Sequence, residues 1–128
     1  MKLAEKNKAF YGFEGVVLAG TPAVNLAEYT LAGNNIKGFK GILNGTTNYI
    51  LTRMEEGMSY EDALKKAQEL GYAEADPTGD VEGLDALGKV VILTNVVLGK
   101  NIGWQDVERK GITGISKEDI KKAKEEGS

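Results

Sequence analysis

The sequence predicts an α+β fold, in which a small mixed β-sheet packs against helices. Residues 10–18 are rich in β-branched and aromatic side chains and are predicted to form a strand. Residues 36–43 alternate apolar residues with others and are predicted to form a second strand. The stretches around them carry the residues that begin and end helices. No repeat, linker or change of composition divides the chain, so residues 1–128 are predicted to be one domain.

The predicted helices follow from signals at their ends. Thr21 and Pro22 predict a helix start, with threonine as the cap and proline in the first helical position. Ser59 followed by Asp62 resembles a capping box, and Ser116 is predicted to cap the last helix. Glycines are predicted to end three of the helices. The helices predicted in this way are residues 1–8, 23–32, 45–56, 60–70, 81–98 and 117–128.

Three segments are less regular or keep alternatives open. Residues 72–80 are predicted to form a loop around a proline, and residues 81–98 contain enough valine and isoleucine to be strand in part. Residues 104–112 are irregular or hold a short third strand. A sheet of two or three strands leaves exposed edges, so we expect it to pair with another chain or with further segments. The chain begins inside a helix and ends just after another, so we expect a piece of a larger protein.

The composition excludes several kinds of chemistry. The chain has 128 residues, of which 41% are hydrophobic and 27% charged, as in an ordinary globular domain. It contains neither cysteine nor histidine, which excludes disulfides, thiolate zinc sites, thiol catalysis and a Ser-His-Asp triad. Acid–base chemistry must therefore use Asp, Glu, Lys or Tyr. The net charge of −3 argues against a nucleic-acid partner.

Nothing in the sequence predicts a secretory or membrane location. The first eight residues lack the apolar core of a signal peptide. The longest apolar stretch, residues 90–98, is interrupted by Thr94 and Asn95 and is shorter than the roughly 20 residues that span a bilayer. We therefore expect no membrane partner and a cytoplasmic location, which the absence of cysteine also fits.

Asp85 and Lys89 are the first candidates for chemistry, because an apolar run follows them directly. On a helix they lie four positions apart on one face, with the acid in the favourable N-terminal place. One interpretation is a lysine, held and tuned by an acid, that exchanges a proton with a substrate hydroxyl. The other is an ordinary surface ion pair, worth about 0.3–0.5 kcal/mol.

Three further acids, Glu74, Asp76 and Asp80, lie in the predicted loop before that helix. Their carboxylates suit an ammonium group, because a carboxylate accepts hydrogen bonds from it. Their spacing departs from the register of an EF-hand, so calcium is discounted. The alternative is a polar turn around Pro77.

Two predicted helix starts offer weaker candidate sites. Gly45 and Thr46 present backbone N–H groups and a hydroxyl that suit a carboxylate or phosphate, although such helix starts are common. The carbonyls of residues 19–22 suit a cation, or belong only to a tight turn. No Gly-x-Gly-x-x-Gly follows a predicted strand, so neither a dinucleotide-binding half nor a P-loop is expected in this chain.

Two long motifs give the chain a specific resemblance. Residues 41–51 read Gly-Ile-Leu-Asn-Gly-Thr-Thr-Asn-Tyr-Ile-Leu. Residues 71–89 begin Gly-Tyr-Ala-Glu-Ala-Asp-Pro and end Asp-Val-Glu-Gly-Leu-Asp-x-x-x-Lys. In this order and at this separation they resemble homoserine dehydrogenase, and the resemblance covers residues 3–126. It implies the catalytic and dimerisation domain of that enzyme, without its Rossmann nucleotide-binding domain.

The resemblance implies a reaction and a set of site residues. The family interconverts aspartate semialdehyde and homoserine with NAD(P). By position, Lys89 is implied as the acid–base group at the substrate hydroxyl, with Asp85 binding and orienting beside it. Glu74 is implied to contact the substrate amino group near the nicotinamide. The other residues implied to line the substrate site are Gly45, Thr46, Tyr72 and Asp80.

The resemblance also implies a cation loop and a second subunit. Residues 14–22 resemble the family's loop for sodium or potassium, whose mostly backbone ligands would come from Glu14, Val17, Ala19 and Thr21. A homodimer is expected. NAD(P) would be bound mainly by the domain that this chain lacks, so we expect the isolated chain to be inactive. The alternative is a non-catalytic dimerisation or interaction module derived from the same domain.

Overall fold

The computed structural model describes residues 2–127, and all the regular structure in this range is helical. The α-helices are α1 (Lys2–Lys6), α2 (Ala23–Asn25), α3 (Gly45–Glu55), α4 (Tyr60–Glu69), α5 (Thr78–Val81), α6 (Leu84–Val97) and α7 (Lys117–Glu125). Shorter helical turns of other types are the 3₁₀ turns η1 (Glu14–Val16) and η3 (Trp104–Asp106) and the π-helical η2 (Leu26–Thr30).

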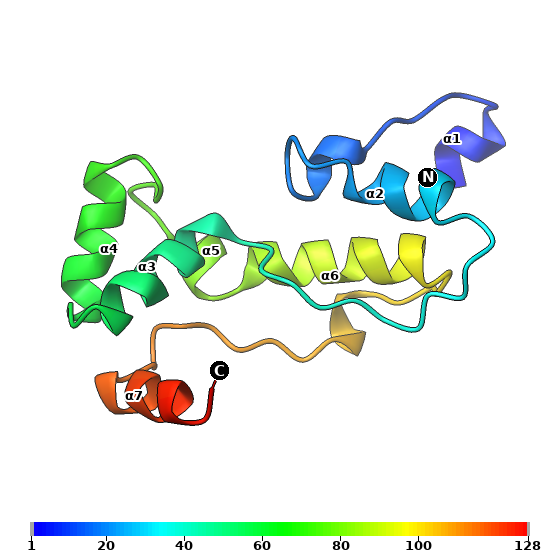
Figure 1. Cartoon of the computed structure of the whole chain (residues 1–128). Coiled ribbons are helices and arrows are strands. Elements are labelled where there is room, and N and C mark those ends of the chain that lie inside the picture. Colours follow the sequence, from blue (N-terminus) through cyan, green and yellow to red (C-terminus); the bar gives the residue numbers. More distant parts are fainter. Residues whose placement is uncertain (1, 128) are drawn as a thin grey trace.

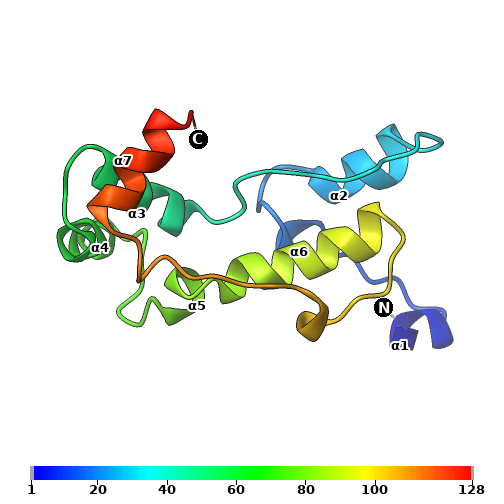
Figure 2. The same ribbon diagram turned by 90° about the horizontal axis from the view of Figure 1, so that it is seen from below.

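The helix α6 runs through the middle of the molecule, and the other α-helices lie toward its two ends, whereas the η3 turn lies alongside it (Figure 1). α3, α4, α5 and α7 lie toward its N-terminal end, whereas α1, α2 and η2 lie toward its C-terminal end (Figure 2). Two long irregular segments join these groups. Residues 31–44 run from η2 to α3, and residues 98–116 return along α6 and bring α7 against α3.

The main core lies where α3 and α4 pack together. Ile50 and Met54 face inward from α3 and are 0% and 3% exposed. Ala63 and Ala67 lie one turn apart on α4 and are fully buried, so the small side chains let the two helices approach closely. Val81 of α5 belongs to the same cluster. This core therefore packs α3 against α5, which directly precedes α6.

The predicted α+β fold with a small mixed sheet is wrong, because residues 2–127 contain no strand. The stretch 10–18 is irregular chain with the η1 turn, 36–43 is irregular throughout, and 104–112 contains only the η3 turn. A strand requires a neighbouring strand that supplies backbone hydrogen bonds. In the described chain, residues 35–43 make no backbone-to-backbone hydrogen bond. Their apolar residues instead line a cavity together with residues of α6 and η2.

Several predicted helix ends are confirmed. Gly57 and Gly71 follow α3 and α4 with φ of +103° and +77°, a backbone conformation that glycine adopts readily. Ser116 caps α7, as predicted. The single helix predicted over residues 81–98 is instead broken, because Gly83 adopts φ +74° and separates α5 from α6. Met1 and Ser128, at the outer ends of two predicted helices, lie outside the described residues.

None of the helices within residues 2–127 is both long enough and apolar enough to cross a membrane.

Gly88, in the middle of α6, lies against the indole ring of Trp104. A Cβ at position 88 would lie 3.4 Å from that ring, which is an ordinary van der Waals distance, and Trp104 is 57% exposed and free to yield. We therefore expect Gly88→Ala to raise the free energy of unfolding by about 0.5–1 kcal/mol, because alanine has the higher helix propensity. Urea unfolding of the purified chain measures this change.

The control for this substitution is Gly83→Ala. At φ +74° a Cβ is strained, so this variant is expected to lose stability. A loss for Gly88→Ala as well would contradict the prediction and show that the indole ring cannot move aside.

Candidate functional site

Asp85 and Lys89 form an ion pair on the first turns of α6. The Lys89 Nζ atom lies 2.6 Å from Asp85 Oδ2 and also donates to the carbonyl oxygen of Leu43 at 2.8 Å. The Lys89 side chain is 19% exposed and that of Asp85 36%, so the pair is less solvated than an ordinary surface pair. An ammonium group has three N–H donors, and these two contacts use two of them. One donor is therefore available for a substrate oxygen.

Asn44 joins this pair to a second carboxylate. Its side chain is the N-cap of α3, where Oδ1 accepts from the Thr47 N–H at 2.8 Å. The Nδ2 atom of Asn44 donates to Asp80 Oδ1 at 2.6 Å and to Asp85 Oδ2 at 2.9 Å. Asn44 is 8% exposed. A single buried amide thus connects the start of α3 with acids on α5 and α6.

The surroundings of Asp85 favour its charged form. Partial burial would raise the pKa of the Asp85 carboxyl, but hydrogen bonds from Asn44 and Lys89 and the positive charge of Lys89 outweigh burial. The pKa of Asp85 therefore lies below its ordinary value. At neutral pH this acid is a carboxylate that can hold a cationic neighbour.

Two cavities meet at Asp85. One, of about 530 Å³, is lined by Asp85 and Lys89 together with Gly15, Val16, Leu18, Ala19, Ile42, Leu43 and Gly45. The other, of about 350 Å³, has a wall of four acids and no basic side chain. Its lining residues are Gly71, Tyr72, Glu74, Asp76, Gly79, Asp80 and Asp85. The ion pair therefore lies between the cavity lined by Lys89 and the acidic cavity, whose carboxylates favour a cation.

Of the acids in the second cavity, Asp76 also has a structural task. Its Oδ1 accepts from the hydroxyl and the N–H of Thr78 at 2.6 and 3.1 Å, as in a polar turn. These hydrogen bonds hold the pKa of the Asp76 carboxyl below its ordinary value. Glu74 is exposed, and within residues 2–127 its backbone carbonyl accepts from Gln68 at 3.1 Å while its carboxylate makes no hydrogen bond. The Glu74 carboxylate is therefore available to a ligand.

Thr46 holds Tyr72, which is one of the residues that line the second cavity. The Thr46 hydroxyl donates to the Tyr72 carbonyl oxygen at 2.7 Å, which fastens the loop after α4 to the first turn of α3. The Tyr72 ring lies 4.9 Å from the ring of Tyr49, centre to centre. Thr46 thus uses its hydroxyl to hold the loop, while Tyr72 is one of the residues that line the acidic cavity.

The loop predicted to bind a monovalent cation forms one wall of the Lys89 cavity. Glu14 uses its carboxylate elsewhere, accepting from the N–H groups of Val24 and Asn25 at 3.0 and 2.7 Å, and so caps α2. The predicted Thr21 cap is therefore wrong, because Pro22 holds the N-cap position and Glu14 makes the capping bonds.

The backbone of this loop is strained at two adjacent residues. Leu18 and Ala19 have φ of +60° and +42°, which residues other than glycine rarely adopt. Val17 is fully buried beside them. Among the described residues, the backbone carbonyls of Glu14 and Thr21 accept hydrogen bonds from Val17 and Ala23. The loop is therefore a tight, fixed turn whose Ala19 lines the Lys89 cavity.

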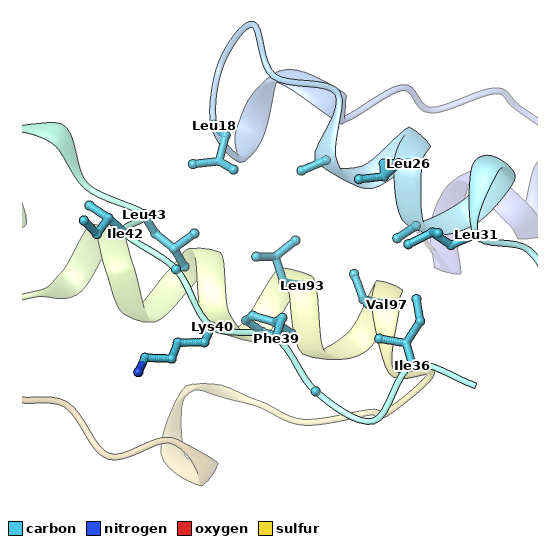
Figure 3. A pocket seen from close by; sticks show the side chains of 14 residues that line it. Leu18, Leu26, Leu31, Ile36, Phe39, Lys40, Ile42, Leu43, Leu93 and Val97 are labelled. Carbon is cyan, nitrogen blue, oxygen red and sulfur yellow. The ribbon is translucent and has the colours of Figure 1, made fainter. Parts of the chain in front are cut away.

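A third cavity, of about 320 Å³, lies next to the first but is lined almost entirely by apolar side chains (Figure 3). Leu26 and Leu31 approach from the η2 side, Leu93 and Val97 from α6. The amino group of Lys40 extends away from them. This cavity lacks the polar groups that would fix a substrate, so it is not the candidate site.

The structure brings most of the predicted site residues together. Asp85, Lys89 and Gly45 border one cavity; Tyr72, Glu74 and Asp80 border the other; Thr46 holds the loop between them. Sequence reasoning did not single out Asn44 or the carbonyl of Leu43. An asparagine directly before a helix is a preferred N-cap, so the cap was detectable from the sequence. Its contacts with two distant acids were not.

The fold and the site define a family. The model of the homoserine dehydrogenase family matches residues 22–128, and the chain belongs to this family. The resemblance carried by the two motifs is thereby confirmed.

Individual relatives agree with this assignment. The chain is 50% identical over 126 residues to the NAD(+)-dependent homoserine dehydrogenase of Pseudomonas canavaninivorans, covering 98% of this chain and 36% of that protein. It is 51% identical over 125 residues to the homoserine dehydrogenase of Methanocaldococcus jannaschii, covering 97% and 37%. A crystal structure of a homoserine dehydrogenase from Thiobacillus denitrificans superposes with a TM-score of 0.92 at 38% identity, covering 98% and 30%. The chain thus spans about a third of the length of these relatives.

Proposed function

We propose that this chain is the substrate-binding and catalytic domain of a homoserine dehydrogenase. The reaction would be the interconversion of aspartate semialdehyde and homoserine, in the cytoplasmic synthesis of threonine, methionine and isoleucine. The observation that carries the proposal is the Asp85–Lys89 pair at the junction of a lysine-bearing cavity and an acidic one. An amino acid with an oxygen at the end of its side chain would need carboxylates for its ammonium group and a lysine for that oxygen.

The acidic cavity would hold the ammonium group of the substrate. Glu74 and Asp80 border this cavity, and the carboxylate of Glu74 is exposed. Carboxylates and an ammonium group form charge-assisted hydrogen bonds, which are stronger than neutral ones. The substrate carboxylate would lie at the N-terminus of α3, where Gly45 borders the other cavity and the helix dipole favours negative charge.

Lys89 would move the proton at the reacting oxygen. In the direction of reduction, the free N–H of its ammonium group would give a proton to the aldehyde oxygen as the carbon accepts a hydride. In the direction of oxidation, the neutral amine would take the proton from the homoserine hydroxyl. Asp85 and the Leu43 carbonyl hold the amino group in place in the ion-paired state.

A nicotinamide cofactor would supply or accept the hydride when it is bound. The chain contains no Gly-x-Gly-x-x-Gly, so its residues do not fit the dinucleotide itself. We propose that NAD(P) is held mainly by residues outside this chain and that this chain alone does not turn over substrate. Glu74, on the exposed side of the acidic cavity, would lie near the nicotinamide.

The loop of residues 14–22 would hold a sodium or potassium ion through backbone oxygens. The strained turn at Leu18 and Ala19 supports this proposal, because such strain is found where carbonyls are aimed at a ligand. The ligands proposed are oxygens of Glu14, Val17, Ala19 and Thr21. The ion would lie beside the Lys89 cavity, which this loop helps to line.

A homodimer is also proposed, since large apolar residues are exposed in the irregular segments as well as on several helices. Phe10 is 97% exposed and Ile42 71%. Residues 35–43 make no backbone-to-backbone hydrogen bond within the described chain, and would gain such bonds from a second subunit or from other parts of the protein.

A homoserine titration of the chain tests the proposed function. Backbone amide signals of Gly45, Glu74 and Lys89 are expected to shift as homoserine is added. The matched ligand is 4-hydroxybutanoate, which lacks only the amino group. Because the acidic cavity recognises an ammonium group, we expect this analogue to bind at least tenfold more weakly, the loss expected for a charge-assisted hydrogen bond.

Two variants complete this experiment. Glu74→Gln is expected to weaken homoserine binding, whereas Glu69→Gln, an exposed acid at the end of α4, should not. Equal binding of homoserine and 4-hydroxybutanoate would contradict the assignment of the acidic cavity. Tight self-association in sedimentation without any homoserine binding would favour the alternative, a non-catalytic dimerisation module.

A further inference from the structure

The orientation of the Asn44 amide is fixed by the helix that it caps. Oδ1 must accept from the Thr47 N–H, and it also receives the Thr47 hydroxyl at 2.9 Å. If the side-chain amide were flipped by 180°, its NH₂ group would face the Thr47 N–H, and two donors would oppose each other. The two hydrogens of Nδ2 are therefore both directed away from α3, one to Asp80 and one to Asp85.

This arrangement solves a problem of like charges. Asp80 and Asp85 share the same amide nitrogen, so their carboxylates lie close together, which disfavours two negative charges. Of these two carboxylates, Lys89 contacts that of Asp85, so its positive charge offsets the charge of Asp85 more than that of Asp80. Glu74 and Asp76 add further negative charge across the acidic cavity. Within the described chain, Asn44 is the neutral donor that both carboxylates share.

We propose that Asn44 is a positioning residue of the site, which holds the carboxylates of Asp80 and Asp85 in fixed orientations at the junction of the two cavities. Asp85 is thereby kept on Lys89, and Asp80 is kept facing the cavity proposed for the substrate ammonium group. The inference deepens the proposed function and rests on it for the identity of the ligand. In this proposal the Asn44 side chain caps α3 and also orients the carboxylates of Asp80 and Asp85.

Capping and positioning can be separated by substitution. Asn44→Asp and Asn44→Ser both keep an oxygen that caps a helix well, because Asp and Ser are preferred N-caps. Both remove the two N–H donors, and Asn44→Asp places a third carboxylate against the other two. A residue that served only as a cap would tolerate either change.

The test is the titration of Asp85 in the 128-residue chain, followed by NMR of its side-chain carboxyl carbon and assigned with Asp85→Asn. We expect the midpoint to move to higher pH in Asn44→Ser and further in Asn44→Asp, because the hydrogen bond that lowers the pKa of Asp85 is lost. Ser116→Ala is the control. It removes the cap of α7, lowers thermal stability and should leave the Asp85 midpoint unchanged.

Two results would overturn the proposal. One is an Asp85 midpoint in both Asn44 variants equal to that of the unaltered chain. The other is a shift of equal size in Ser116→Ala, which would show that any lost cap disturbs the site.

Homoserine affinity gives a second readout. Asn44→Ser is expected to bind homoserine about tenfold more weakly, the factor that corresponds to one lost hydrogen bond with a charged group. If the unaltered chain binds no homoserine, the proposed function fails. The carboxyl titration would still decide whether Asn44 positions the two acids.

Discussion

Replacing Lys89 with methionine is expected to lower turnover by about 10² to 10⁴-fold, the contribution usual for a general acid or base. The assay requires a complete enzyme, so the chain would replace the matching segment of the Methanocaldococcus jannaschii relative, which is 51% identical to it. Methionine is unbranched and has an apolar side chain of similar shape to the lysine stem, and it lacks the amino group. The measurement is kcat for homoserine oxidation and for aspartate semialdehyde reduction, in both the chimera and its variant.

Arginine at the same position separates proton transfer from charge. Lys89→Arg keeps a cation beside Asp85 but cannot release a proton near neutral pH. If Lys89 moves the proton, the arginine variant should be almost as impaired as the methionine variant. Recovery by arginine would limit Lys89 to electrostatic binding. Lys100→Met, at an exposed lysine beyond α6, controls for loss of a positive charge.

Ile50→Ala is expected to lower the free energy of unfolding by about 2–5 kcal/mol, the range found for large-to-small changes in tightly packed cores. Ile50 is 0% exposed and packs in the cluster that joins α3 to α4 and to Val81. A domain is stable by only about 5–15 kcal/mol, so one such change removes a large share. Urea unfolding monitored by circular dichroism gives the difference.

Ile42→Ala is the matched control for this substitution. The same atoms are removed, but Ile42 is 71% exposed, so we expect a change within about 0.5 kcal/mol. A loss below about 1 kcal/mol at Ile50, or equal losses at both positions, would mean that the α3–α4 contact is not the core of the chain.

Local signals predicted the helices well and the strands badly. Ser59 and Ser116 cap helices, and glycines end them, because a helix makes its hydrogen bonds within a few residues of sequence. Residues 10–18 and 36–43 have the composition of strands, but a strand takes its hydrogen bonds from a distant segment. Within residues 2–127 no such segment is present, so these stretches stay irregular, and several of their apolar side chains are exposed.

The sequence by itself determined the family and the Asp85–Lys89 pair. Two contiguous motifs carry the resemblance, and a spacing of four on a helix places the acid and the lysine side by side. Both are local properties, which is why they could be inferred without a structure. The structure shows that Asp76 makes a polar turn and that Glu74 borders the acidic cavity, whereas the binding of an ammonium group there stays a prediction.

Only the tertiary structure decided what surrounds that pair. Asn44 meets Asp80 and Asp85 across 36 and 41 residues of sequence, and Leu43 meets Lys89 across 46. The core that packs Val81 of α5 with residues of α3 and α4 brings α3 against α5, which directly precedes α6 in the chain. No spacing or composition records such a meeting, since it depends on how whole helices pack and not on the residues that neighbour each other along the chain.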